Sequence, residues 1–280
     1  MIVRRRGRGT SPSAGYFHAV SPTYASRYEE ASPGGNAARV RKRRVLELLS
    51  QRGVPEINRL LDVGCGPGIM VEDALQLGYE FWGIDVAPGM IEQCRKRYGG
   101  STRAHFAIGN AVKLEFPDEC FDTVLCMGVI DHIADHRQAI SEMLRVLRRG
   151  GMLLIAYPNL LSPYALWRKY VFYPLVRLLK LAYFRLRGRV RPQALTYAGR
   201  LHTRRSVCSA ITSSGAVVKN VVYFNFNVML SPLDEWAPRL TVRLTETLEL
   251  FHNGMLRWLC CAFIVKAIKC PGPDGGPPRR

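Results

Sequence analysis

The feature that most constrains the fold of this chain is a regular alternation of strand-like and helix-like segments between residues 59 and 158. Five short apolar segments have the length and composition of buried strands: 59–63, 80–84, 104–108, 122–127 and 152–156. Helical patterns separate them over 69–77, 88–97 and 135–147. Apolar strands that alternate with helices of this length predict a parallel sheet with helices on both faces, which is a doubly wound α/β fold.

Segments on both sides extend this core. A helix is predicted over 37–51, and a helix at 204–213, a strand at 216–226, a helix at 241–251 and a strand at 258–268 follow later in the chain. The last two strands complete a mostly parallel, seven-stranded sheet. We therefore expect one folded domain over 37–270, a basic flexible segment over 1–36 and a disordered tail over 271–280.

The first strand runs directly into the glycine-rich turn LLDVGCGPG, residues 60–68. Its glycines allow backbone conformations that are closed to other residues, and they let a ligand approach the main chain. The exposed N–H groups and the dipole of the following helix suit a polar or anionic group. Ile69 stands where a dinucleotide-binding turn has its third glycine. The carboxylate of Asp62 would repel a pyrophosphate, whereas it suits the ammonium group of an amino acid.

Four motifs in succession make this signal specific. LLDVGCGPG, GIDVAPGMIEQCRKR, FDTVLCMGVIDHI and VLRRGGMLLIAYPN resemble the successive motifs of class I S-adenosylmethionine (SAM)-dependent methyltransferases. The likeness is greatest to the small-molecule branch, which includes the ubiquinone-type and malonyl-carrier-protein methyltransferases. It covers residues 40–158 well and residues 200–268 more loosely. The resemblance implies a Rossmann-like methyltransferase fold with SAM as the cofactor.

The same resemblance implies which residues contact SAM. They are Asp62, Gly64, Cys65, Gly66, Gly68, Asp85, Val86, Met90, Asn110, Ala111, Met127 and Asp131. Asp62 belongs to the methionine end, and Asp85 ends the second strand, where an acid accepts both ribose hydroxyls. Met90 packs on the adenine, and Asn110 lies beside the adenine amine. Because the family often has Asp at that last place, an uncharged Asn predicts weaker cofactor binding.

The sequence offers two candidates for a general base. His132 follows the fourth strand, and His202 lies in the motif LHTRR beyond the insertion described below. An imidazole can accept a proton near neutral pH. The alternative, favoured for both, is that His132 only shapes the pocket and that His202 is a surface residue. Four aromatic residues of the first segment are able to close over the site: Tyr16, Phe17, Tyr24 and Tyr28.

Charge and cysteine content bear on partners and compartment. Lys and Arg number 40 against 22 Asp and Glu, so the formal charge is +18. Such a charge leaves anionic lipid and an acidic carrier protein open as partners, whereas nucleic acid is disfavoured because no recognisable RNA-binding module is visible. The eight cysteines form no C-x-x-C pair, which indicates reduced thiols in a cytoplasmic compartment and no metal site.

A basic, aromatic-rich insertion is predicted over 159–205. No carboxylate occurs between Glu142 and Asp234. We expect a helical lid that covers the acceptor pocket and contains a kink at Pro174. We also expect this lid to rest on an anionic membrane as a peripheral contact. The alternative is an ordinary lid whose Lys and Arg side chains reach solvent. The oligomeric state does not follow from the sequence.

These observations predict an enzyme that transfers a methyl group from SAM to a small hydrophobic acceptor, at oxygen. Two alternatives stay open. One is a methyltransferase whose acceptor is bound to a carrier protein or is a nucleic acid. The other is a SAM-fold binding protein without turnover.

Overall fold

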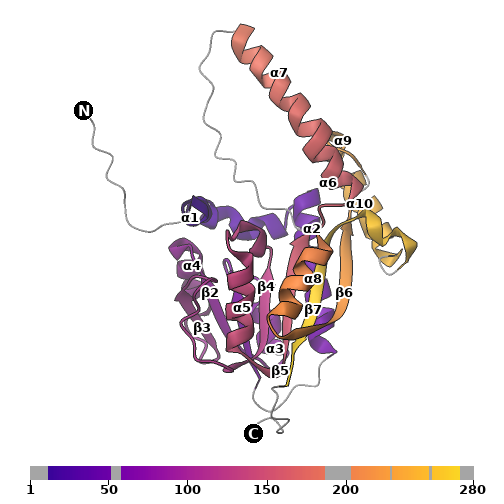
Figure 1. Cartoon of the computed structure of the whole chain (residues 1–280). Coiled ribbons are helices and arrows are strands. Elements are labelled where there is room, and N and C mark those ends of the chain that lie inside the picture. Colours follow the sequence, from indigo (N-terminus) through magenta and orange to yellow (C-terminus); the bar gives the residue numbers. More distant parts are fainter. Residues whose placement is uncertain (1–11, 52–57, 187–202, 228, 252–253, 272–280) are drawn as a thin grey trace, which may run out of the picture.

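A computed structural model describes residues 12–51, 58–186, 203–227, 229–251 and 254–271. Its centre is a seven-stranded sheet in the order β3-β2-β1-β4-β5-β7-β6 (Figure 1). The strands are β1 (Arg59–Val63), β2 (Glu80–Asp85), β3 (Ala104–Ile108), β4 (Phe121–Met127), β5 (Leu147–Pro158), β6 (Ala216–Phe226) and β7 (Cys260–Lys269). The first five run parallel, and β7 runs antiparallel to β5 and to β6. The predicted doubly wound, mostly parallel fold is confirmed.

The strand order places a ligand site at one end of the sheet. β1 pairs with β2 on one side and with β4 on the other, so the order of the strands reverses at β1. The connections after β1 and β4 leave in opposite directions there, which opens a crevice beyond their carboxyl ends. The glycine-rich turn follows β1 directly and therefore lies in this crevice.

Helices cover both faces of the sheet with separate apolar cores. On one face α2 (Pro33–Ser50), α3 (Val71–Gln76) and α4 (Pro88–Tyr98) bury side chains such as Leu49 and Ile91. On the other face α5 (His136–Val146) and α8 (Arg204–Ser213) bury side chains such as Ile140 and Ile211. Both faces are buried, which explains why the strands read as nearly continuous apolar runs.

The described part of the N-terminal segment is helical. Within residues 1–36, predicted to be a flexible segment, lie α1 (Pro12–Tyr24) and the short 3-10 helix η1 (Ala25–Tyr28), and α2 begins at Pro33. Ser32 caps α2 by accepting a hydrogen bond from the Gly35 N–H at 3.1 Å. α1 is held on α4 because His18 Nδ1 accepts a hydrogen bond from the Gly89 N–H at 3.2 Å. Contacts between distant segments, rather than local pattern, thus order this part of the chain.

The described part of the insertion is helical. It comprises α6 (Pro163–Trp167), the π-helical turn η3 (Arg168–Phe172) and α7 (Tyr173–Leu186), which projects away from the sheet (Figure 1). Pro174 lies in the first turn of α7, where its missing N–H is tolerated, and the irregular turn η3 comes directly before it. Residues 187–202 lie outside the described part. No helix among the described residues is long and apolar enough to span a bilayer.

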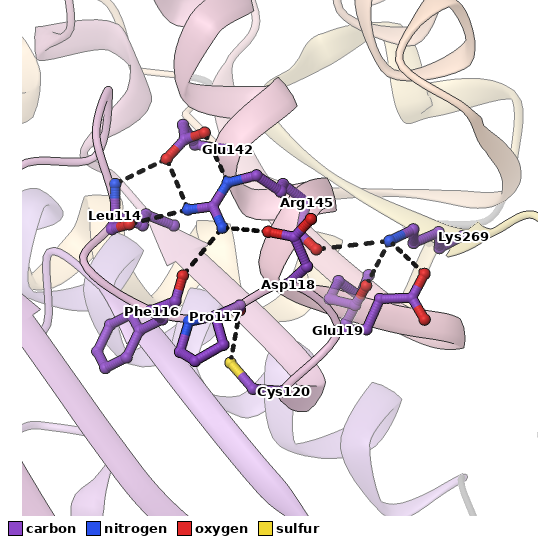
Figure 2. A network of polar contacts seen from close by, with 10 residues as sticks. Leu114, Phe116, Pro117, Asp118, Glu119, Cys120, Glu142, Arg145 and Lys269 are labelled. Carbon is purple, nitrogen blue, oxygen red and sulfur yellow. Dashed lines mark hydrogen bonds and ion pairs between the residues drawn. The ribbon is translucent and has the colours of Figure 1, made fainter. Parts of the chain in front are cut away.

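An arginine on α5 holds the loop between β3 and β4 (Figure 2). The Arg145 guanidinium donates to the carbonyl oxygens of Leu114 at 2.8 Å and Phe116 at 2.9 Å, and to the Asp118 carboxylate at 2.6 Å. Glu142 accepts hydrogen bonds from Arg145 and from the Leu114 N–H, and Arg145 lowers the pKa of its carboxyl. These bonds fix a loop whose first residues, 110–112, line the crevice described next.

Candidate cofactor-binding and active site

A cavity of about 500 Å³ lies beyond the carboxyl ends of β1, β2 and β4. This volume is typical of a small-molecule site. Most of the residues that the sequence predicted to contact the cofactor or the acceptor line it: Asp62, Gly64, Cys65, Gly66, Asp85, Val86, Met90, Asn110, Ala111, Met127 and His132. Gly68 and Asp131 do not line it. His202 lies outside the described residues.

The glycine turn owes its shape to close backbone packing. Gly64 has a φ of +79°, and a Cβ atom there would lie 2.2 Å from Cγ2 of Val129. Gly66, with a φ of +55°, faces the cavity, and a Cβ atom there would meet only the Tyr24 ring at 3.8 Å. Both positions therefore need glycine for backbone reasons, and Gly66 also leaves room for a ligand.

Gly68 has a packing role in the turn. Its φ is +82°, and a Cβ atom there would lie 2.9 Å from the Tyr98 ring and 3.2 Å from Cys94 Sγ. The absence of a side chain lets the start of α3 approach α4. The contact of Gly68 with the cofactor stays a prediction.

Asp62 carries an unsatisfied oxygen in the cavity wall. Its side chain is only 3% exposed, and Oδ1 has no hydrogen-bond partner among the described residues. Burial and then the nearby Asp85 raise the pKa of this carboxyl to about 7, although Arg41 opposes the shift. A buried acid with a free oxygen stabilises a cation that enters the cavity. The ammonium group of the methionine part of SAM fits this position.

Asp85 joins the end of β2 to the glycine turn. Its Oδ2 accepts a hydrogen bond from the Gly66 N–H at 3.1 Å, and Oδ1 accepts one from the Ala87 N–H at 2.9 Å. Burial raises the pKa of this carboxyl, and these backbone hydrogen bonds lower it. Each carboxylate oxygen can accept more than one hydrogen bond, so both remain able to receive a ribose hydroxyl.

The predicted adenine end is apolar on one side and polar on the other. Met90 is 1% exposed and Ala111 is 8% exposed, and both line the cavity. The Asn110 side-chain oxygen accepts a hydrogen bond from the Val112 N–H at 3.2 Å. This bond orients the amide, and the oxygen keeps a second lone pair for an amine. The roles of these three residues toward the adenine stay predictions.

Arg41 of α2 is the main residue of this cavity that the sequence reading missed. Its guanidinium donates to the Tyr28 hydroxyl at 3.0 Å and lies against the backbone of Gly128, where a Cβ atom would be 2.3 Å from Nη1. It also lines the cavity and interacts electrostatically with Asp62. A cation here suits a carboxylate. The signal in the sequence was its spacing from Ala38 and Val45, which places the three on one helix face.

Aromatic rings close the cavity beside His132. The Phe17 ring of α1 meets the His132 ring edge-on at 5.2 Å and the Tyr24 ring at 6.2 Å. His132 ends the short helix η2 (Ile130–His132), and its Nε2 lies 3.7 Å from Oδ2 of Asp131. Asp131 does not line the cavity itself, since its carboxylate lies beside His132, and the prediction that it contacts the cofactor stays a prediction.

The described cover of the cavity comes from the N-terminal helices. α1, η1 and α2 contribute Phe17, Tyr24, Tyr28 and Arg41, and the first three are among the aromatic residues expected to close over the site. No described residue of 159–186 lines the cavity, and α7 points away from the sheet (Figure 1). The helical lid over 159–205 stays a prediction, since residues 187–202 lie outside the described part.

Comparison with known proteins agrees with this geometry. Residues 61–155 match a family described as "Methyltransferase domain". This part of the chain is a methyltransferase domain. A relative named as a probable SAM-dependent methyltransferase from Mycolicibacterium smegmatis is 34% identical over 100 residues, which are 36% of this chain and 38% of that protein. The malonyl-[acyl-carrier protein] O-methyltransferase of Serratia marcescens is 30% identical over 133 residues, or 47% and 51% of the two chains.

The methyltransferase domain also has the fold of solved methyltransferases. A SAM-dependent methyltransferase from Thermotoga maritima superposes with a TM-score of 0.57 at 18% identity, over 91% of this chain and 99% of the other. The chain spans between a third and about half of the length of the curated relatives it matches. SAM is the cofactor of this class, and the orphaned Asp62 oxygen, the glycine turn and Asp85 fit its methionine and ribose parts.

Proposed function

We propose that this protein transfers the methyl group of SAM to an oxygen atom of a small hydrophobic acceptor. The observation that carries the proposal is that one cavity holds two kinds of lining. Asp62, Asp85 and Arg41 supply polar groups that suit the charged cofactor, and the Phe17 and Tyr24 rings with His132 supply a lining that suits an apolar acceptor. The Serratia relative is itself named an O-methyltransferase, which supports oxygen as the acceptor atom.

Each group of this chain has a defined task in that reaction. When bound, SAM supplies an electrophilic methyl group on a sulfonium. Asp62 holds the ammonium, Arg41 the carboxylate and Asp85 the ribose, so that the reacting centre is aligned for in-line displacement. Phe17 and Tyr24 exclude water and receive the apolar part of the acceptor.

His132 is placed to take the proton of an acceptor hydroxyl. It lines the cavity where β4 ends, and Asp131 lies beside its Nε2. Its Phe17 contact equally fits a residue that only shapes the pocket, and kinetics distinguish the two roles.

The test is transfer of radiolabelled methyl from SAM to a panel of hydrophobic phenols and carboxylic acids. We expect labelled ether or ester products that form at unchanged rate from low to moderate salt. Transfer that occurs only to a carrier-bound acceptor, and that falls steeply with salt, would instead indicate docking through the basic surface. SAM binding without transfer to any acceptor would identify a binding protein.

His132→Ala should lower kcat by about 10²- to 10⁴-fold, leave SAM affinity nearly unchanged and flatten the acid limb of the pH–rate profile. Calorimetry with SAM and steady-state kinetics measure the two effects separately. A loss below about tenfold, without a change in the pH profile, would assign His132 a shaping role.

A further inference from the structure

Nearly all the described side chains of the helix α7 are exposed. Leu175, Leu178, Leu179 and Tyr183 are 52%, 64%, 62% and 47% exposed, and the helix extends away from the rest of the protein (Figure 1). A single helix of 14 residues is marginally stable in water without packing. Apolar side chains at this density on an unpacked helix therefore indicate a surface that something else covers.

One face of α7 carries an apolar stripe. Leu175, Leu178, Leu179 and Ala182 follow the spacing i, i+3, i+4 and i+7, so they share this face. Arg177 and Lys180 follow two and five residues after Leu175, which places them on the opposite side together with Leu181, while Arg185, seven residues after Leu178, lies at the edge of the stripe. An apolar stripe opposed by cations is the pattern of a helix that lies in the plane of a membrane interface.

The base of α7 is fastened to the domain by polar bonds. The Tyr164 hydroxyl donates to Oδ2 of the buried Asp234 at 2.5 Å, and Trp167 Nε1 donates to the Ser231 carbonyl at 2.9 Å. Arg168 Nη1 donates to the Tyr164 hydroxyl at 3.3 Å. These bonds join α6 and η3 to the region of α9 (Leu233–Trp236). The helix is therefore presented from a defined point, and Trp236 of α9, 77% exposed, lies beside that point.

The positive charge of residues 159–186 indicates which kind of partner covers α7. Residues 159–186 contain the five cations Arg168, Lys169, Arg177, Lys180 and Arg185 and no carboxylate. A second copy of the chain would bring like charges together, whereas anionic lipid headgroups neutralise them. Each Lys or Arg near an anionic surface adds to the attraction. Fourteen residues span about 21 Å, less than the roughly 30 Å bilayer core, so the helix can lie in the interface but cannot cross it.

We propose that α7 docks this protein on the surface of an anionic lipid bilayer, with the Leu175–Leu178–Leu179 face in the acyl boundary and the cations among the headgroups. This docking does not depend on the methyl transfer proposed above, because it concerns a surface outside the cavity.

Co-sedimentation of the full chain with vesicles tests the proposal. Vesicles of phosphatidylcholine with phosphatidylglycerol are compared with phosphatidylcholine alone, at low and moderate salt. Two variants of identical composition form a matched pair. Leu179→Ser changes the apolar face, whereas Leu181→Ser changes a leucine four residues after Arg177, on the cationic side.

We expect binding to anionic vesicles only, reduced about tenfold by Leu179→Ser and less than about twofold by Leu181→Ser. Arg177→Gln with Lys180→Gln should weaken binding several-fold more than the control Lys96→Gln with Arg97→Gln, which removes two exposed cations from α4. Circular dichroism and SAM affinity, unchanged in every variant, confirm intact folding.

Three results would overturn the proposal. Equal losses in the two serine variants would show that the apolar face of α7 makes no contact with lipid. Equal losses in the two charge variants would assign binding to the overall charge of +18. Sedimentation velocity that shows a dimer abolished by Leu179→Ser, with no vesicle binding, would assign the face to a second copy of the chain.

Discussion

The cofactor end of the sheet and the helix α7 use similar residues in opposite ways. Both are rich in leucine, but Leu60, Leu61 and Leu125 are 0% exposed, whereas Leu178 and Leu179 are more than half exposed. At the cofactor end, apolar burial forms a rigid frame, and it isolates a few polar atoms such as Asp62 Oδ1 that a ligand can satisfy. In α7 the apolar side chains themselves are exposed to solvent. The comparison indicates that the first region recognises a polar ligand and the second an apolar surface.

Asp85→Ala should produce the largest effect in the cofactor region. It removes the carboxylate that receives the ribose and that also accepts from the Gly66 N–H at 3.1 Å. Two charge-assisted hydrogen bonds are worth about 1.5–3 kcal/mol each, so SAM affinity should fall at least 100-fold. Calorimetry measures this loss, and Asp73→Ala, which removes an acid outside the cavity, is the control. Unchanged affinity in a folded Asp85→Ala protein would refute the site.

Truncation of one buried and one exposed leucine compares the packing of the sheet with that of α7. Leu125→Ala should lower the free energy of unfolding by about 2–5 kcal/mol, because it leaves a cavity in the buried centre of β4. Leu178→Ala should change it by less than about 0.5 kcal/mol, because the side chain is 64% exposed. Denaturant titration of both variants measures the difference. Comparable losses would show that α7 is packed in solution and would remove the basis for treating it as a free surface.

The affinity for SAM should depend on pH through Asp62. The pKa of this buried carboxyl is about 7, so below that pH the free protein carries a proton there. The ammonium of SAM needs the ionised form, and binding must then release the proton. Affinity should therefore rise by up to about tenfold per pH unit as the pH approaches 7 from below, and level off above it.

Two variants distinguish the titration of Asp62 from that of other groups in the cavity. Asp62→Asn should bind SAM more weakly and with a flat pH dependence. His132→Asn, which removes the imidazole of the same cavity, should keep the dependence. Calorimetry between pH 5.5 and 7.5 in buffers of different ionisation enthalpy reports the proton release. A wild-type affinity that is constant over this range would contradict the assignment of the ammonium to Asp62.

The sequence predicted the sheet and the residues at its cofactor end better than it predicted the surroundings of α7. The strands at 104–108 and 216–226 and the helix at 204–213 lie where they were predicted, because local periodicity determines them. The cavity residues on the glycine turn and on β2 were also predicted, since each directly follows or ends a strand and parallel strands share one carboxyl edge.

What the sequence did not predict depends on contacts between distant segments. The order of α1 rests on His18 and Gly89, which are 71 positions apart, and local composition carries no trace of that bond. The position of the Asp131 carboxylate beside His132 depends on the path of one short turn. The direction of α7 is set by Tyr164 and Asp234, 70 positions apart. Composition showed that this helix is amphipathic but not that it leaves the cavity uncovered.

Two glycines with similar backbone angles test whether close packing at the glycine turn sets the shape of the cofactor cavity. Gly64 and Gly150 have φ angles of +79° and +70°, so alanine strains both by a similar amount. At Gly150 a Cβ atom meets nothing within 4 Å, whereas at Gly64 it would overlap Val129, whose branched side chain has little freedom to move. Gly64→Ala should displace the turn after β4 and weaken SAM binding by about tenfold, through overpacking worth about 1–3 kcal/mol. Gly150→Ala should leave SAM affinity within about twofold while lowering the melting temperature by a few degrees. Equal SAM affinities in the two variants would mean that the contact between Gly64 and Val129 does not set the shape of the cavity, and that the positive φ alone explains the glycine.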